Sequence, residues 1–391
     1  MVRNKRNIAL LLAVYCLQGI VFYSPIATLY RQAAGLDLLQ IGFIESVCLG
    51  VMLALEIPWG IVADRIGHRR TIVICAALFA LSKVIFWRAE SFVDFLAERI
   101  VLGACLAGLS GCDSAFLFAC CAAGGHRKVY AQCEAVQTLG MLAAALIWPL
   151  LGGNYRLSAL LTVGTYTAAA LLTLLLREPE GTRTQEARQA PPLTLRQAAK
   201  HTLALAPVLL AICLLRETAQ TVTVFLGQLQ FAAAGIPQGW FGVLQAGVIG
   251  AGLLGGLSHR LLRRLGARRA GGVLMAAGAA ACLLPVLCPG ALGAVVSVIA
   301  LRAVQSLLGP LSLSLQTEQA PAAGRATQLS CNAMLMDVAA MGVYPAFGAL
   351  ADRGVNAAFL LGGVCCGIAL VLYGCFFRWK NNSAGPGWEG A

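Results

Sequence analysis

The sequence predicts an all-α polytopic membrane protein with twelve membrane-spanning helices in two pseudo-symmetric six-helix bundles. Of its 391 residues, 59% are hydrophobic and 12% are charged, whereas about a quarter of the residues of a soluble protein are charged. The apolar residues form continuous runs of the length that a membrane-spanning helix needs. A β-barrel is excluded, because barrel strands alternate polar and apolar residues.

Twelve apolar runs, separated by polar segments, give the predicted helices in order. The first run follows a basic N-terminal segment similar to a signal peptide, but it continues to about Tyr30, so we expect a retained helix. The predicted spans are 8–30, 39–62, 71–89, 92–122, 130–151, 157–176, 203–231, 239–259, 271–288, 291–315, 328–350 and 355–377.

The distribution of Lys and Arg predicts the orientation in the membrane. With both termini in the cytoplasm, 21 of the 29 Lys and Arg residues fall in inside loops and tails, and four fall in outside loops, Arg31 among them. Such an excess is the positive-inside bias of membrane proteins. The net charge of +12 therefore reflects topology, and nucleic acid is not an expected partner.

The cysteines and histidines do not indicate a metal site or a cofactor. The chain has 15 cysteines and four histidines, but no Cys-x-x-Cys and no metal-ligand spacing. Most of the cysteines lie in predicted spans, where they suit helix packing. No Walker loop is present, so we expect neither a metal nor a cofactor.

Two similar halves flank a polar linker. Residues 178–202 are rich in charge and contain Pro191-Pro192, which indicates a cytoplasmic linker between an N-terminal bundle, 1–177, and a C-terminal bundle with a short tail, 203–391. The halves align by eye: Gly67 matches Gly266 and Arg99 matches Arg302. Two six-helix repeats are typical of transporters that rock about a midplane binding site.

The segment between the second and third spans carries a recognisable motif. "GIVADRIGHRR" resembles G-x-x-x-D-R-x-G-R-R, the loop 2–3 signature of the major facilitator superfamily, with His68 where an arginine is usual. "LEIPWGIVAD" and "LSGCDSAFLF" resemble a bacterial 12-helix branch that is similar to proton-coupled drug and metabolite efflux permeases. The resemblance implies the superfamily fold and a gating role for the matching residues, Gly60, Asp64, Arg65, Gly67, Arg69 and Arg70.

Two further stretches resemble motifs of the same superfamily. "LAERIVLGACLAG" is similar to its span-4 motif, with Arg99 as the motif's arginine. "AALIWPLLGG" partly resembles the span-5 antiporter motif G-x-x-x-G-P-x-x-G-G, although Ala144 and Trp148 replace glycines. The residues that match the antiporter motif are Pro149, Gly152 and Gly153.

Ionisable residues inside the predicted spans are candidates for proton coupling, because a charge at membrane depth is costly unless it is paired, hydrated or neutralised. Arg99 and Asp113 are fourteen residues apart on span 4, nearly four helical turns, which predicts that they share a face. The alternative is a structural Arg–Glu pair that only orients packing, and Glu45 is a further candidate for such pairing. The predicted proton-coupling residues are Asp113, Glu98, Arg99, Glu217 and Asp337.

Polar stripes on three spans predict the lining of a substrate cavity. On span 7, Glu217 and three residues at helical spacing form one face, which favours a wet cavity over lipid; hydrogen bonding between helices is the alternative. Met residues on span 11 suit an irregular apolar ligand or plain core packing, and Arg302 suits an anionic substrate group or an acid such as Glu217. The predicted cavity residues are Tyr15, Gln18, Phe22, Arg216, Gln220, Thr221, Gln228, Arg302, Met334 and Met341.

These observations predict a secondary active transporter that works by alternating access. We expect proton-coupled export, by antiport, of a small amphipathic compound, from a monomer in the bacterial inner membrane, with the lipid bilayer, the substrate and protons as partners. Uptake by proton symport is the main alternative. An intramembrane enzyme would need a nucleophile–base or metal cluster at one depth, and a signalling or scaffold protein would tolerate loss of the buried acids.

The positive-inside bias explains the arginines of the loop 2–3 signature but does not explain Asp64. A carboxylate is favourable near a helix N-terminus, and the family resemblance places this loop beside the cytoplasmic start of span 11. We therefore expect Asp64 to latch the two halves on the cytoplasmic side. The alternative is that Asp64 only offsets its neighbouring arginines.

Overall fold

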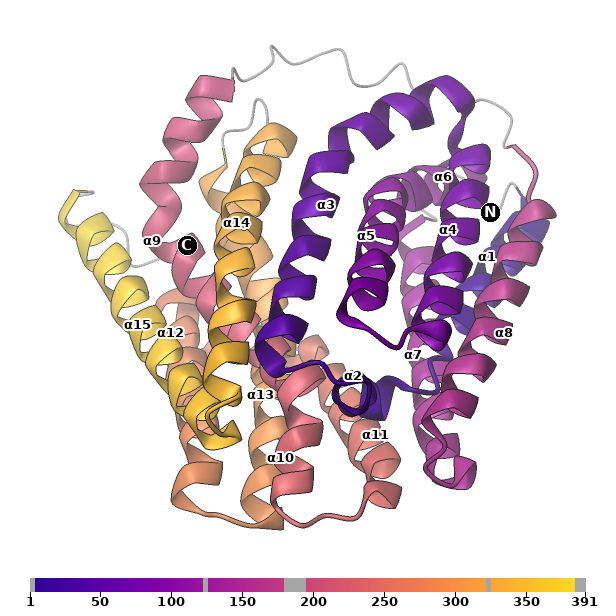
Figure 1. Ribbon diagram of the computed structural model, residues 1–391. Coiled ribbons are helices and arrows are strands. Elements are labelled where there is room, and N and C mark those ends of the chain that lie inside the picture. The colour runs from indigo at the N-terminus through magenta and orange to yellow at the C-terminus, as the bar shows by residue number, and fades with distance from the viewer. Residues whose placement is uncertain (1–3, 122–125, 179–194, 321–324, 384–391) are drawn as a thin grey trace. The chain divides into compact units, whose positions relative to one another are not determined.

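The computed structural model describes residues 4–121, 126–178, 195–320 and 325–383 (Figure 1). These residues are helical and contain no β-strand, which confirms the all-α prediction. Most of the predicted linker 178–202 lies outside the described residues. The chain forms two compact units, one of residues 1–187 and 237–249, the other of residues 188–236 and 250–391.

The first unit contains the helices of the predicted N-terminal bundle. α4 packs against both α5 and α8, α3 packs against α5, and α1 packs against α7 and α8 (Figure 1). Its second segment adds η5 (Gln238–Trp240) and most of α11 (Phe241–Gly252). The other elements are α1 (Lys5–Gly19), η1 (Ser24–Ile26), α2 (Ala27–Ala33), α3 (Leu38–Ile66), α4 (His68–Arg88), α5 (Phe92–Leu109), α6 (Cys112–Cys120), α7 (His126–Ile147), η2 (Trp148–Leu151) and α8 (Tyr155–Leu174).

In the second unit, α12 packs against α13 and α15, and α9 packs against α14 and α15. The elements of this unit are α9 (Leu195–Thr221), the π-helical turn η4 (Val222–Leu226), α10 (Gly227–Ala233), η6 (Leu253–Leu257), α12 (Ser258–Leu287), α13 (Ala291–Gln319), α14 (Arg325–Ala351) and α15 (Val355–Ser383).

The helices confirm the prediction of a multi-pass membrane protein. Eleven helical stretches among the described residues are long and apolar enough to cross a membrane. One of them, Gln238–Leu287, is 50 residues long and contains two predicted spans, 239–259 and 271–288. It is interrupted at Gly266, whose backbone is non-helical (φ 69°, ψ 161°), so the twelve predicted spans are all present.

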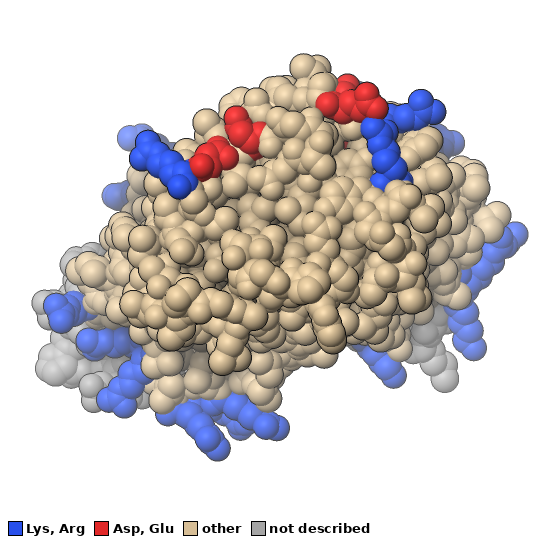
Figure 2. Space-filling view, turned by 60° about the horizontal axis from the view of Figure 1, so that its bottom comes forward, with Lys and Arg blue, Asp and Glu red and all other residues tan. Residues whose placement is uncertain are grey.

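The surface has the character expected of a protein embedded in lipid. In Figure 2 the charged side chains lie toward the margins of the view, and uncharged residues fill the area between them. Large apolar side chains are well exposed, for example Leu139 (61%), Leu171 (60%) and Val364 (57%). An apolar surface of this extent is unfavourable in water and favourable against acyl chains.

Turn residues of the two units confirm the internal repeat. After α2, Gly35 has a φ of 90°, and after α10, Gly235 has a φ of 74°. Both helices end in the same pattern of hydrogen bonds, from the amide after the glycine to the carbonyl five residues earlier, which is a Schellman motif. The next corner also matches, because Gly67 and Gly266 both have positive φ.

Three predicted spans are interrupted at positions where the hydropathy of the sequence indicates no break. Span 1 ends as a helix at Gly19 and resumes at Ser24. Span 4 is divided into α5 and α6 by Ser110 and Gly111, the latter in the left-handed region. Span 7 contains the π-helical turn Val222–Leu226. A π turn holds an extra residue, so the side chains after it point in different directions from those of a continuous α-helix.

Glycines allow α1 and α7 to approach closely. A Cβ atom on Gly19 would meet the carbonyl oxygen of Gln137, and a Cβ on Gly140 would meet the carbonyl oxygen of Cys16. Only glycine permits such backbone contact, and small residues serve this purpose between membrane helices. In the second unit, the thiol of Cys282 packs over Gly362 in a similar way.

Candidate functional site

Asp113 lies at the break in span 4. It belongs to the first turn of α6, which follows Gly111 (φ 76°). Its Oδ1 accepts a hydrogen bond from the backbone N–H of Ser114 at 2.6 Å, and its Oδ2 accepts one from the Tyr15 hydroxyl at 2.6 Å. The expectation that Arg99 and Asp113 share one helical face is wrong, because the helix between them is interrupted.

A cavity of about 510 Å³ opens beside Asp113 within the first unit. It lies between α1, α4, α5, α6, α7 and α8, and the predicted residues Tyr15 and Gln18 line it together with Asp113. Phe22 is not among its lining residues, because α1 ends at Gly19 and the stripe does not continue. The other polar side chains of its lining are those of Ser110, Ser114, Tyr130, Glu134, Gln137 and Thr173.

A second charged cluster is buried in the same unit. Arg99 contacts two carboxylates, with Nη2 2.8 Å from Glu45 and Nε 3.5 Å from Glu98. Glu45 is shared with Arg31, at 3.2 Å. Arg99 and Glu45 are each 13% exposed, and Arg31 and Glu98 are almost fully buried. This arrangement corresponds to the alternative of a structural Arg–Glu pairing, extended to two arginines and two glutamates.

The sequence does not indicate the contacts of two further cations in this region, Arg31 and Lys83. The prediction that Arg31 lies in an outside loop is wrong, because its side chain is 1% exposed and belongs to α2. Lys83 is buried, and its ammonium lies 5.0 Å from the ring centre of Phe79, 5.1 Å from that of Tyr166 and 5.9 Å from that of Tyr23. Cation–π contacts of this kind stabilise a desolvated ammonium, and only the position of Lys83 within an apolar run signalled them.

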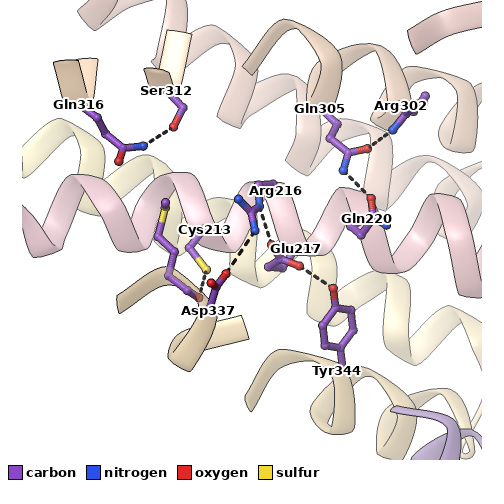
Figure 3. A network of polar contacts seen from close by, with 11 residues as sticks. Cys213, Arg216, Glu217, Gln220, Arg302, Gln305, Ser312, Gln316, Asp337 and Tyr344 are labelled. Atoms are coloured by element: carbon purple, nitrogen blue, oxygen red, sulfur yellow. Dashed lines mark hydrogen bonds and ion pairs between the residues drawn. The ribbon is translucent and has the colours of Figure 1, made fainter. Parts of the chain in front are cut away.

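In the second unit, Glu217 is the centre of a polar network (Figure 3). Its Oε1 lies 2.6 Å from Nε of Arg216, and its Oε2 accepts a hydrogen bond from the Tyr344 hydroxyl at 2.7 Å. Arg216 also lies 3.8 Å from Asp337 on α14. The Arg216 side chain is 45% exposed and that of Glu217 is 3% exposed, so the arginine faces outward and the glutamate inward.

A separate chain of hydrogen bonds joins α13 to α9 (Figure 3). Nη1 of Arg302 donates to Oε1 of Gln305 at 2.9 Å, and Nε2 of Gln305 donates to Oε1 of Gln220 at 2.8 Å. All three side chains are half-buried. Arg302 thus contacts neutral amide groups rather than Glu217.

The remaining predicted cavity residues divide into two groups. Thr221 and Gln228 are buried, and the π turn Val222–Leu226 lies between them. Gln228 donates to the carbonyl of Val224 at 3.0 Å. On α14, Met334 is exposed and Met341 half-buried. Whether these residues line a substrate path stays a prediction.

Comparison with protein families decides the identity of the fold. The model of the Major Facilitator Superfamily matches residues 8–343. The chain belongs to the major facilitator superfamily. A comparison with curated protein sequences found no match.

Solved structures of superfamily transporters have the same fold. The chain is similar to the nucleoside transporter NupG, with a TM-score of 0.77, 15% identity and coverage of 96% of this chain and 98% of the other. For a D-xylose-proton symporter the TM-score is 0.70 at 18% identity, with 96% of both chains covered. For a bacterial homologue of the human lysosomal transporter Spinster the TM-score is 0.71 at 16% identity, with 95% of this chain and 96% of the other covered. The protein is therefore a superfamily transporter and not an enzyme.

The superfamily signature between α3 and α4 has one clear structural role. Arg69 donates to the carbonyls of Leu174 and Leu176, at 2.9 Å and 2.6 Å, and so satisfies free carbonyls at the C-terminal end of α8. Gly67 has the positive φ that the corner needs. The side chains of Asp64, Arg65 and Arg70 are exposed and line a recess of about 630 Å³, and Gly60 is exposed on α3.

The latch assigned to Asp64 gives a testable prediction. If Asp64 latches the cytoplasmic side, Asp64→Asn is expected to slow turnover and to raise accessibility from that side, because the charge that the hypothesis requires is then absent. Arg264→Ala, near the equivalent place in the repeat, is the control and is expected to change little. Spin-label distances across the cytoplasmic gate measure the effect, and equal distances in wild type and Asp64→Asn contradict the latch. Of the 15 cysteines, only Cys288 and Cys375 are exposed, which limits the native thiols that compete for the label.

The antiporter-like residues of the superfamily form the end of the fifth span. Pro149 lies in the short helix η2, beside the buried Trp148, and Gly152 and Gly153 follow with φ of 61° and 74°. The Trp148 indole donates to the carbonyl of Gln238 at 3.2 Å. The two glycines are therefore required by the turn itself.

Proposed function

We propose that this transporter couples the export of a small amphipathic compound to protons, with Asp113 as the proton-carrying group. The observation that carries the proposal is the pairing of Asp113 and Tyr15 at 2.6 Å beside a polar-lined cavity. An ionisable residue at membrane depth that borders a cavity is a candidate member of a proton path.

Two hydrogen-bond donors and a helix N-terminus surround the Asp113 carboxylate. The Tyr15 hydroxyl and the Ser114 amide donate to it, and it lies in the first turn of α6, where a carboxylate is favourable. Glu217 and Asp337 are further coupling candidates in the second unit, where Arg216 contacts both. For Glu98 and Arg99 the ion pairs support a structural role.

The cavity supports an amphipathic substrate. Its size of about 510 Å³ falls within the range of small-molecule sites. Its apolar side chains include Leu11, Ile72 and Phe79, and its polar side chains include those of Asp113, Gln137 and Thr173. A compound with one apolar part and one polar part would be matched by such a lining.

Uptake by proton symport is the second candidate. The partial antiporter motif at Pro149, Gly152 and Gly153 supports export, whereas the similar fold of a D-xylose-proton symporter favours symport. The positive-inside bias supports cytoplasmic termini, and the resemblance to bacterial permeases supports a monomer in a bacterial inner membrane. We retain bundle boundaries of 1–177 and 203–391, joined by the linker 178–202.

Pyranine-loaded proteoliposomes distinguish the candidates. Compounds that raise the melting temperature in a screen of metabolites and antibiotics are added outside, with equal pH on both sides. Antiport is expected to raise the internal pH, because protons leave as the compound enters. A fall in internal pH indicates symport. Compound entry without any pH change contradicts proton coupling, and protein-free liposomes provide the baseline.

A further inference from the structure

The two repeat-related arginines, Arg99 and Arg302, have opposite surroundings. Arg99 contacts the carboxylates of Glu45 and Glu98. At the corresponding positions in the second half stand Gln245 and Leu301, neither of which carries charge. Among the described residues, Arg302 makes no ion pair within 4.0 Å, and its guanidinium donates to the neutral amide of Gln305.

The acid that the sequence offers as a partner for Arg302 is already engaged. One oxygen of Glu217 lies 2.6 Å from Arg216, and the other accepts from Tyr344 at 2.7 Å. The carboxylates of Glu217 and Asp337 both lie within 4.0 Å of Arg216. Neither of them makes an ion pair with Arg302.

An uncompensated guanidinium in a membrane-spanning helix is unfavourable, and charged residues there normally pair or face water. The contacts of Arg302 fix the position of its guanidinium group but do not neutralise its charge. Gln305 accepts from Nη1 and is itself oriented by its bond to Gln220. On another side, the guanidinium lies against the backbone of Gly252, where a Cβ would come 3.2 Å from Nη2. The half-buried side chain is thus positioned with its positive charge available.

We propose that Arg302, positioned by Gln305 and Gln220, binds an oxyanion group of the transported compound, a carboxylate or a phosphate. A guanidinium presents paired N–H donors that match the two oxygens of such a group. The free amide N–H of Gln220 adds a neutral donor one helical turn from Arg216. This inference rests on the proposed transport function and names the chemical class of its substrate.

The charge class of the transported compounds is measurable before any substrate is known. Untargeted mass spectrometry compares the cytoplasm and medium of cells that express the wild-type chain with cells that carry the empty vector. The compounds whose distribution changes are expected to carry a carboxylate or a phosphate. Transported compounds without either group overturn the inference and leave the transport function standing. No change for any compound contradicts the transport function itself.

Variants of Arg302 then test the contact. The probe is the compound identified in cells, used beside an uncharged ester, which is the methyl ester of a carboxylate or the fully esterified form of a phosphate, and binding is measured by thermal shift of the full chain. Arg302→Gln is expected to weaken binding of the acid by about tenfold or more, with little change for the ester. Arg302→Lys should retain part of the affinity. Arg353→Gln, which removes an exposed arginine, is the control. Equal affinity in wild type and Arg302→Gln overturns the proposal.

The stability of the unliganded variant separates a binding role from a structural role. Since Arg302 compensates no carboxylate, Arg302→Gln is expected to melt at the wild-type temperature or above it. A melting temperature several degrees below wild type would assign Arg302 to the folding of the unit and overturn the proposal.

Discussion

Asp113→Asn is expected to lower ΔpH-driven transport by about tenfold or more, which corresponds to about 1.4 kcal/mol in the limiting barrier. The amide keeps the size of the carboxyl group and one acceptor for the Tyr15 hydroxyl, which lies 2.6 Å away. It does not exchange a proton between the two sides. The measurement is compound flux in proteoliposomes with an imposed pH gradient, and exchange of compound at equal pH reports whether the binding site and the fold survive.

A matched control comes from the same cavity. Glu134 also lines it, but its side chain is exposed, so Glu134→Gln is expected to retain most of the ΔpH-driven flux. Tyr15→Phe removes one donor to the Asp113 carboxylate and is expected to weaken ΔpH-driven transport without abolishing it. Undiminished ΔpH-driven flux in Asp113→Asn removes Asp113 as the coupling group, and Glu217 and Asp337 are then the carboxylates to replace.

Arg99→Gln is expected to give the largest loss of stability, about 3–5 kcal/mol. The variant removes the cation that contacts Glu45 at 2.8 Å and Glu98 at 3.5 Å. Glu98 is fully buried, so in a desolvated site its carboxylate would lose the one ion pair within 4.0 Å that it makes among the described residues. The measurement is the melting temperature of the purified chain in a fixed detergent, with the yield of folded protein as a second readout.

The repeat supplies the control for this variant. Arg302→Gln changes the corresponding residue of the other half, where no carboxylate depends on it, and is expected to cost no stability. The double variant Glu98→Gln with Arg99→Gln should recover part of the loss, because Glu98, which loses its ion pair with Arg99, is then neutral, while Glu45 keeps its ion pair with Arg31. A melting temperature for Arg99→Gln equal to that of Arg302→Gln would contradict a structural role for the cluster.

The membrane spans were predictable from the sequence because the cost of burying charge in lipid acts on every residue of a long run. All twelve apolar runs correspond to helices, and the charged corner between α3 and α4 lies where the signature motif indicates. The repeat was also predictable, since Gly67 and Gly266 make the same positive-φ corner. A glycine is the residue that such a corner requires.

The interruptions within the spans were not predictable from hydropathy. Ser110 and Gly111 break span 4 without changing its apolar character, and no charged residue marks the π turn at Val222–Leu226. Both features depend on how neighbouring helices pack. They also interrupt the helical register before Asp113 and before Gln228, so the spacing of a continuous α-helix does not apply across them.

The partners of the buried charges depend on contacts that are distant in the sequence. Arg31 follows an apolar run and therefore has the appearance of a loop arginine, but it pairs with Glu45 on the next helix. Lys83 is surrounded by rings from α4, α8 and the segment before η1. Residue type and spacing identified Asp113 and Glu217 as candidates, but not the tyrosines that donate to each of them.

The backbone contacts between α1 and α7 restrict which parts of the first unit are able to move. With Gly19 against Gln137 and Gly140 against Cys16, the two helices have no side-chain layer between them that could deform. We expect them to travel as one rigid body during the transport cycle, so that Tyr15 keeps its distance from Glu134 and Gln137. The helix is broken at Ser110 and Gly111, so we expect any change in the angle between α5 and α6 to occur there. Such a change would alter the distance from Asp113 to Tyr15, and the proposed proton-carrying group would then respond to the bending of a single helix.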